Sequence, residues 1–352
     1  MTNSILAPSF LPTSAVLEMT YECNHKCLFC SCPWESKSGF EKRAPLTKDE
    51  WKTVIKTITE LGVSSISFTG GEPLLNKDIV DIMMFAASLK CSMIETENNI
   101  LVTKNQPLKI YLISNGSLLS DEILNVCWNH NIHLSMSLPG LDTYFLHTAY
   151  GSPDKILELF NKASSFGVNT TVNITVTKLN LYELYKIISN SLIAGAETVL
   201  LNRFLPGGRG LDNAEKLMLN TDEVNEMLDI TEEVLKTANR YGHVGTELPK
   251  CIIKNLGKYN HLKVSTTCSA GKDFFVIGPS GYIRTCNHSP IELCYYKDYE
   301  NLKSSKYWNS FVFKDYCPDM CQNCIELYNC DCGCREAAHV FSGNLNDKDP
   351  LC

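Results

Sequence analysis

Residues 23–30 read CNHKCLFC, so Cys23, Cys27 and Cys30 follow the spacing C-x3-C-x2-C on one short loop. No fourth partner completes the pattern. Three thiolates on one loop suit a cubane iron–sulfur cluster that keeps one iron free for a ligand other than protein. An iron with an open position can bind and activate a substrate, whereas a four-thiolate site is closed. This loop is therefore a candidate catalytic centre.

The sequence around the loop alternates between β-rich runs and amphipathic segments. We expect strands at 15–20, 64–69, 109–114, 132–138, 170–176 and 198–204, and helices near 47–61, 77–89, 120–129, 153–166 and 180–195. Thr47 and Ser120 suit the N-caps of two of these helices. Strand–helix alternation predicts a parallel sheet of the α/β class, and six units predict a partial (β/α)6 barrel of the TIM type.

Other segments interrupt or follow this pattern. Residues 90–108 are longer than a usual helix-to-strand connection, and we expect a small hairpin there, near the substrate opening. The run PGGRG at 206–210 closes the barrel, and a helix is expected at about 221–241. We divide the chain into a barrel at 1–215, a bridging helix at 216–250 and a small cysteine-rich domain at 251–352.

The composition limits the class of protein. Hydrophobic residues make up 44% of the chain and charged residues 20%, as in ordinary globular proteins. A net charge of −7 without a basic run gives no reason to expect a nucleic-acid or membrane partner. We expect a cytoplasmic protein, because we find neither a signal peptide nor an apolar run long enough to span a membrane. The 17 cysteines then favour metal binding over disulfides.

Polar signatures stand at the carboxyl ends of the predicted strands, where active sites of such barrels gather. They are Gly70-Gly71-Glu72-Pro73 after the second strand, Ser114-Asn115-Gly116 at the end of the third, and Ser135 and Ser137 in the fourth. GGEP alone could be a turn that tolerates positive φ. Convergence of these loops on one rim favours a ligand site instead.

CNHKCLFC and GGEP together resemble the radical S-adenosylmethionine (SAM) enzymes, over roughly residues 15–205. The resemblance implies that Cys23, Cys27 and Cys30 hold a [4Fe–4S] cluster whose fourth iron is chelated by SAM. It implies further SAM contacts from Gly70, Gly71, Glu72 and Pro73 to the methionine amine, from Ser114 and Asn115 to the ribose, and from Ser135 and Ser137 to the methionyl group. One electron then cleaves SAM to methionine and a 5′-deoxyadenosyl radical, which abstracts a hydrogen from the substrate.

Single positions agree with or depart from the pattern of this family. Phe29 stands where the family usually places an aromatic ring against adenine, with simple loop packing as the alternative. Pro139 replaces an acidic residue of many relatives, and Tyr150-Gly151 replaces an arginine–glycine pair that holds the SAM carboxylate. Another group must hold that carboxylate, and our candidate is Arg203 at the end of the sixth strand.

The carboxy-terminal third is rich in cysteine. It reads Cys268-x12-Gly281-x4-Cys286, then Cys321-x2-Cys324-x5-Cys330-x3-Cys334, then Cys352. A lone C-x2-C is more often a zinc site, but this order resembles the SPASM extension of radical SAM enzymes, which binds two auxiliary [4Fe–4S] clusters.

The resemblance implies two sets of ligands, which would give three clusters per chain. One set is Cys268, Cys286 and Cys334, and the other is Cys321, Cys324, Cys330 and Cys352. The first set lacks a fourth member, for which Cys251 in the segment ELPKC is our candidate; an open iron is the alternative.

Three further cysteines of this region, Cys294, Cys317 and Cys332, are candidates for a catalytic thiol that donates a hydrogen atom or binds substrate. For each of them, ordinary packing as a small apolar residue is the alternative.

SPASM-bearing relatives mostly act on peptides and proteins. We expect an oxidoreductase or peptide maturase that cross-links, epimerises or oxidises residues of a peptide, as in RiPP maturation. The alternatives are modification of a small molecule or tetrapyrrole, for which PGGRG offers a basic loop, and a non-enzymatic electron carrier or zinc-stabilised binding protein. The expected partners are the peptide and an electron donor such as flavodoxin or ferredoxin. The first strand begins too early for a leader-binding module, so we expect any leader to be bound either by a separate leader-peptide-binding protein or by the barrel and its insertion.

Overall fold

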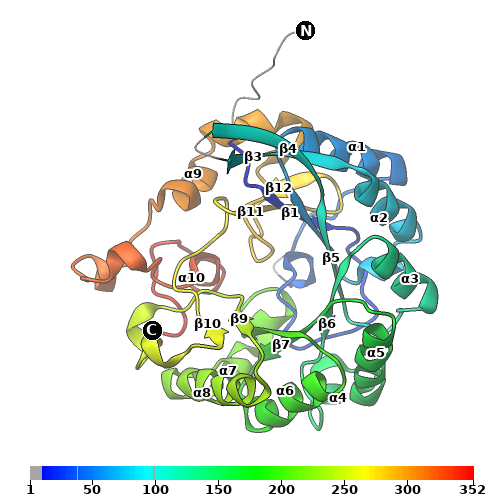
Figure 1. The fold of residues 1–352 in the computed structure, drawn as a ribbon. Coiled ribbons are helices and arrows are strands. Elements are labelled where there is room, and N and C mark those ends of the chain that lie inside the picture. The colour runs from blue at the N-terminus through cyan, green and yellow to red at the C-terminus, as the bar shows by residue number, and fades with distance from the viewer. Residues whose placement is uncertain (1–9, 38, 98–99) are drawn as a thin grey trace.

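The computed structural model describes residues 10–37, 39–97 and 100–352. Six strands pair in parallel in the order β1 (Ser14–Glu18), β2 (Ser65–Thr69), β5 (Lys109–Ser114), β6 (His133–Ser137), β7 (Thr170–Val176) and β8 (Thr198–Arg203). They coincide with the six predicted strands, and the partial barrel is confirmed. The sheet curves around the centre of the molecule in Figure 1.

The helices between these strands cover the outer face of the sheet (Figure 1). They are α1 (Lys48–Glu60), α2 (Ile79–Ser88), α3 (Asp121–Asn129), α5 (Pro153–Ser165) and α6 (Leu184–Ile193). Both predicted caps are present, since the Thr47 side chain accepts from Glu50 N and the Ser120 side chain accepts from Ile123 N. Trp51 of α1 is completely buried, so the apolar face of this helix lies in the core.

The sheet continues on both sides of the six strands. Beyond β8 come β9 (Gly242–Val244) and β10 (Leu262–Lys263), and beyond β1 come β11 (Phe274–Ile277), β12 (Tyr282–Arg284) and β13 (Cys294–Tyr295). β11 is parallel to β1, whereas β12 and β13 are antiparallel additions. One sheet therefore crosses the boundaries that we predicted between barrel, bridge and cysteine-rich segment, and the domain division stays a prediction.

The insertion before β5 is an antiparallel hairpin of β3 (Lys90–Glu97) and β4 (Ile100–Pro107), as predicted, with its turn outside the described residues. β3 follows α2 almost directly, and β4 ends next to the start of β5. The hairpin therefore leaves the barrel at the amino-terminal edge of the sheet. The expected position near the substrate opening is wrong, because that opening lies at the carboxyl ends of the strands.

The remaining helices are α4 (Tyr144–Thr148), α7 (Ala214–Leu217), α8 (Thr221–Ala238), α9 (Lys306–Phe313) and α10 (Arg335–Ser342). α8 is the helix predicted at about 221–241. The five-residue α4 was missed, because one turn is too short to produce a periodic pattern. In the part of the chain that the structure describes, no helix is long and apolar enough to cross a membrane.

Candidate active site

The cysteine loop follows β1 and is paired with the GGEP loop that follows β2. Gly71 N donates to Thr20 O (2.9 Å) and Glu72 N donates to Glu22 O (2.8 Å). Gly70 has a φ of +142°, and a Cβ there would lie 2.7 Å from the Thr20 carbonyl oxygen. A Cβ on Gly71 would overlap the Glu22 carbonyl. These two positions accept only glycine because the two loops approach each other so closely.

Glu72 fixes the rim of the barrel. Its side chain is buried, and its carboxylate accepts from Ser114 Oγ (2.8 Å), Asn115 N (2.8 Å) and Leu74 N (3.2 Å). Burial raises the pKa of Glu72, and the three donors act in the opposite direction. The carboxylate thus holds two strand ends together, which is an anchoring role.

Of two other predicted SAM contacts, Asn115 has a hydrogen-bond partner in the cysteine loop, whereas Ser135 has none among the described residues. Asn115 Nδ2 donates to Asn24 Oδ1 (2.8 Å), which ties the end of β5 to the cysteine loop. Ser135 is buried in β6, and within residues 10–37, 39–97 and 100–352 its Oγ has no hydrogen-bond partner. A buried hydroxyl without a partner is a position where a ligand can supply the missing hydrogen bond. Ser137, two residues on, is half-buried.

Helix α4 supports one side of the cysteine loop. Lys26 N donates to Thr148 O (3.0 Å), and Leu28 N donates to His147 O (2.8 Å). The His147 ring is fully buried and lies 5.8 Å from the Phe29 ring, centroid to centroid. Phe29 also packs against the small apolar cluster around Phe204 and lines the cavity described below, so its position fits both of its predicted roles.

The PGGRG loop supports the other side. It leads into a short 3-10 helix, Gly208–Asn213. Gly210 N donates to Cys30 O (2.9 Å), and Arg209 Nη1 donates to Cys27 O (3.1 Å). Arg209 also forms an ion pair with Glu35. Arg209 is therefore committed to the cysteine loop, and its side chain is not free to bind an anionic ligand such as a tetrapyrrole carboxylate.

A cavity of about 640 Å³ opens between the barrel and the cysteine-rich segment, within the ~300–1,000 Å³ range of small-molecule sites. Its lining includes Phe29, Cys30 and Cys32 of the cysteine loop, the ends of β1, β2, β7 and β8, the edge strand β10, and three tail cysteines. Strand ends and cysteine groups thus face one space.

One wall of this cavity was not foreseen. Glu18 at the end of β1 is buried, forms an ion pair with Arg284 of β12, and accepts a hydrogen bond from Asn287 Nδ2 (3.3 Å). A glutamate inside the apolar run AVLEMT was the available signal. The partner could not be named, since 266 residues separate the two sides of the ion pair.

The first group of tail cysteines, Cys268, Cys286 and Cys334, lines this same cavity. Cys268 N donates to Asp331 Oδ2 (2.7 Å), and Cys334 N donates to Asp349 Oδ2 (2.7 Å). Burial raises the pKa of all three thiols. Binding of a metal centre would release these protons and stabilise the thiolates.

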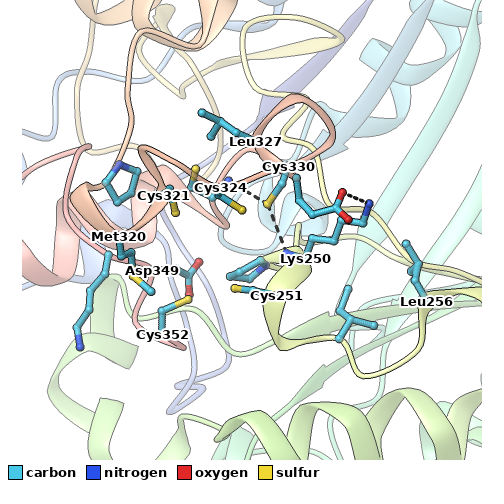
Figure 2. A pocket seen from close by; sticks show the side chains of 16 residues that line it. Lys250, Cys251, Leu256, Met320, Cys321, Cys324, Leu327, Cys330, Asp349 and Cys352 are labelled. Carbon is cyan, nitrogen blue, oxygen red and sulfur yellow. Dashed lines mark hydrogen bonds and ion pairs between the residues drawn. The ribbon is translucent and has the colours of Figure 1, made fainter.

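The second group surrounds a separate cavity of about 330 Å³. Figure 2 shows five cysteines around it, Cys251, Cys321, Cys324, Cys330 and Cys352; Cys332 also lines it. Cys330 Sγ accepts hydrogen bonds from Lys250 N (3.4 Å) and Cys332 N (3.3 Å). Cys251 was predicted to join Cys268, Cys286 and Cys334. The structure corrects that grouping, because Cys251 lies against Cys352 of the second group.

Arg203 departs from its predicted role as well. Its side chain is buried, and its Nη atoms donate to both carboxylate oxygens of Asp349 (3.2 and 2.6 Å) and to Glu247 O (3.2 Å). Only Nε is without a partner in the described residues. The guanidinium therefore ties β8 to the carboxy-terminal tail, which leaves a single donor for a SAM carboxylate.

The three thiol candidates, Cys294, Cys317 and Cys332, are absent from the lining of the barrel cavity, as far as the described residues define it. Cys294 is buried in the main core, and Cys332 faces the second cavity. Cys32 does line the barrel cavity, with its Sγ 3.8 Å from Gly70 O. Its position after the C-x3-C-x2-C motif was the only signal for it.

Comparison with known proteins identifies the family. The sequence model of the radical SAM superfamily matches residues 17–188, which include the cysteine loop, GGEP and the strands through β7. Residues 17–188 form a domain of the radical SAM superfamily. Membership implies a [4Fe–4S] cluster and SAM as cofactors, and three thiols beside a glycine cradle are a donor set that fits them.

Among curated radical SAM relatives, the PqqA peptide cyclase of Bradyrhizobium diazoefficiens is 26% identical over 359 residues, covering 97% of this chain and 86% of the relative. The PqqA peptide cyclase of Gluconobacter oxydans is 24% identical and covers 97% of this chain and 90% of the relative. The likeness therefore includes the cysteine-rich tail as well as the barrel.

Solved structures share the fold. Streptococcus suis SuiB bound to its precursor peptide SuiA superposes with a TM-score of 0.72 at 16% identity, covering 97% of this chain and 76% of that one. The structure of anSMEcpe with bound AdoMet superposes with a TM-score of 0.69 at 17% identity, covering 97% and 94%. This radical SAM chain therefore has the fold of both proteins from barrel to tail.

Within residues 10–37, 39–97 and 100–352, no three Cys, His, Asp or Glu side chains come close enough to hold one metal ion. The two cysteine groups are therefore defined by the cavities that they line.

Proposed function

We propose that this radical SAM enzyme modifies a peptide or protein after abstracting a hydrogen atom from it. One observation carries the proposal: the cavity at the GGEP rim extends to β10, the edge strand of the sheet, where Lys263 and Ser265 line it. An extended peptide can pair with such an edge through its backbone. The curated relatives named PqqA peptide cyclase and the fold shared with a precursor-peptide complex support the same substrate class.

The cysteine loop holds the SAM-binding cluster in this account. Cys23, Cys27 and Cys30 are its ligands, and the bound cluster supplies the electron that cleaves SAM. Gly70 and Gly71 let the GGEP loop lie directly against the cysteine loop, Ser135 offers SAM an unpaired hydroxyl, and Phe29 closes the adenine side. Arg209 and α4 keep the loop in place, and the carboxy-terminal segment covers the cavity against water.

The tail holds two auxiliary clusters, which gives three clusters per chain. Cys268, Cys286 and Cys334 contribute to the one that faces the substrate cavity, and Cys321, Cys324, Cys330 and Cys352 hold the other. Their shared cavities support this division. Such a chain requires an electron donor such as flavodoxin or ferredoxin. A separate leader-binding protein and a cytoplasmic location stay predictions.

The alternatives are weaker. The hypothesis of a tetrapyrrole substrate requires a free basic loop at the barrel mouth. Arg209 of that loop is instead paired with Glu35 and with Cys27 O. An electron carrier needs closed clusters and no glycine cradle for a substrate-sized ligand.

The test is anaerobic incubation of the reduced, reconstituted enzyme with SAM and candidate peptides, encoded beside the gene, followed by mass spectrometry. We expect 5′-deoxyadenosine and a peptide lighter by two hydrogen atoms for a cross-link or oxidation, or deuterium uptake from D2O for epimerisation. If 5′-deoxyadenosine forms and labelled hydrogen reaches it from a small molecule but from no peptide, the substrate class is wrong.

A further inference from the structure

The segment Glu247–Cys251 passes between the two cysteine groups of the tail. Cys251, at its end, lines the cavity of the second group, whereas Glu247, at its start, lines the barrel cavity with the first group. The backbone of the segment is fixed, because Glu247 O accepts from Arg203 Nη2 (3.2 Å) and Leu248 N donates to Ser265 O (3.0 Å). The backbone at position 247 is therefore fixed beside the first group.

The same contacts bring Glu247 next to the thiols of the first group. Arg203, which binds the Glu247 carbonyl, also binds Asp349, and Asp349 accepts from Cys334 N (2.7 Å). Glu247 lines the barrel cavity together with Cys268, Cys286 and Cys334. One carboxylate thus faces the same space as all three thiols.

In the part of the chain that the structure describes, the Glu247 carboxylate accepts no hydrogen bond and forms no ion pair. The nearby guanidinium of Arg203 is already paired with Asp349. Both carboxylate oxygens are therefore available to a group bound in the cavity, and the iron of a cluster is a positively charged group of that kind.

The other carboxylate beside these thiols is differently placed. Glu336 also lines the cavity, but its Oε1 accepts from Tyr307 (2.7 Å) and Thr285 (3.1 Å). It is held away from a ligand role by those donors. His288 is the remaining competitor, because it lines the cavity and its Nδ1 is buried without a hydrogen bond among the described residues.

We propose that Glu247 is the fourth protein ligand of the auxiliary cluster held by Cys268, Cys286 and Cys334. The inference rests on the proposed assignment of auxiliary clusters to the tail. A carboxylate oxygen is a usual ligand for iron in proteins, and it would be displaced more readily than a thiolate.

The test uses the full-length reconstituted enzyme with SAM in excess, so that SAM occupies the open iron of the first cluster. Cyanide is then titrated into wild type, Glu247→Ala and Glu247→Cys, with the reduced auxiliary clusters followed by electron paramagnetic resonance. Glu336→Gln is the matched control from the same cavity, and His288→Ala tests the competing ligand.

We expect the Glu247→Ala variant to show a shifted signal of one auxiliary cluster before cyanide is added. The cyanide concentration that changes this signal should be roughly tenfold lower than in wild type, a difference of ~1.4 kcal/mol in binding free energy. Glu247→Cys should resist cyanide, and Glu336→Gln and His288→Ala should match wild type. A wild-type spectrum in Glu247→Ala, or the shift appearing in His288→Ala, overturns the assignment. If wild type itself holds only about four irons per chain, both the auxiliary clusters and the Glu247 ligand are ruled out. If wild type has its full iron content and the Glu247 variants behave like wild type, only the Glu247 ligand is ruled out.

Discussion

Gly71 decides how closely the GGEP loop can approach the cysteine loop. A methyl group there would overlap the Glu22 carbonyl, and overpacking of this kind costs about 1–3 kcal/mol. We predict that Gly71→Ala weakens SAM binding and lowers iron retention at the first cluster, measured by SAM titration and iron analysis. Gly257→Ala is the control, because its nearest neighbour would be an ordinary 3.6 Å away. Equal SAM affinity in both variants would contradict the close-approach argument.

Single residues also show what a sequence can reveal. The three thiols of the cysteine loop and the GGEP glycines were predicted, because their spacing is local. Arg203 was assigned to SAM, yet its partner Asp349 lies 146 residues away. Cys251 was assigned to the wrong group for the same reason: spacing along the chain says nothing about which of two cavities a side chain enters.

At the scale of elements, the PGGRG turn and its short helix hold the cysteine loop. Arg209 joins them through Cys27 O and Glu35, whereas Lys37 joins the same two segments through an exposed pair with Asp212. We predict that Arg209→Ala speeds iron loss from the first cluster under a chelator several-fold. Lys37→Ala should lose iron at the wild-type rate, because exposed pairs contribute only ~0–1 kcal/mol. Similar rates for both variants would remove the special role of Arg209.

Helix α4 makes the support of the cysteine loop sensitive to pH. Burial lowers the pKa of His147 below 6.5, against the opposite effects of the Thr143 carbonyl and Glu183. Below pH 6.5 the unfolded chain therefore binds a proton at this position that the folded chain does not, and stability falls as pH falls. The free energy of unfolding is measured by urea denaturation at one pH above 6.5 and one below it. We predict that it falls less between the two in His147→Gln than in wild type.

The control for this helix is His130→Gln, at an exposed position. It should keep the wild-type slope of stability against pH. A His147→Gln variant that also keeps the full slope would mean that the acid sensitivity arises elsewhere.

Elements with a clear period were predicted well, and those without one were not. The six strands and helices α1, α2, α3, α5, α6 and α8 were found from alternation and caps. The one-turn helix α4 and the short strands β9 to β13 were missed, because two to five residues carry no measurable period. The hairpin was found but placed at the wrong end of the sheet, since its length alone says nothing about that.

At the scale of the whole molecule, a buried ion pair fastens the carboxy-terminal tail to the barrel. Arg203 and Asp349 are almost fully inaccessible, and removing one partner of such a pair costs about 3–5 kcal/mol. We predict that Arg203→Met lowers the free energy of unfolding by that order and reduces iron bound to the tail. Lys258→Ala, which breaks the exposed pair with Asp229, should do neither. A stable Arg203→Met variant with full iron would show that the tail docks without this pair.

Formation of 5′-deoxyadenosine from SAM by the reduced, anaerobically reconstituted protein tests the radical SAM assignment most directly. We predict that wild type, with iron near about twelve per chain, produces 5′-deoxyadenosine and that Cys27→Ala produces none while keeping the iron of its tail. Wild-type protein that carries its clusters and binds SAM, yet forms no 5′-deoxyadenosine with reductant and a peptide substrate present, would contradict the account.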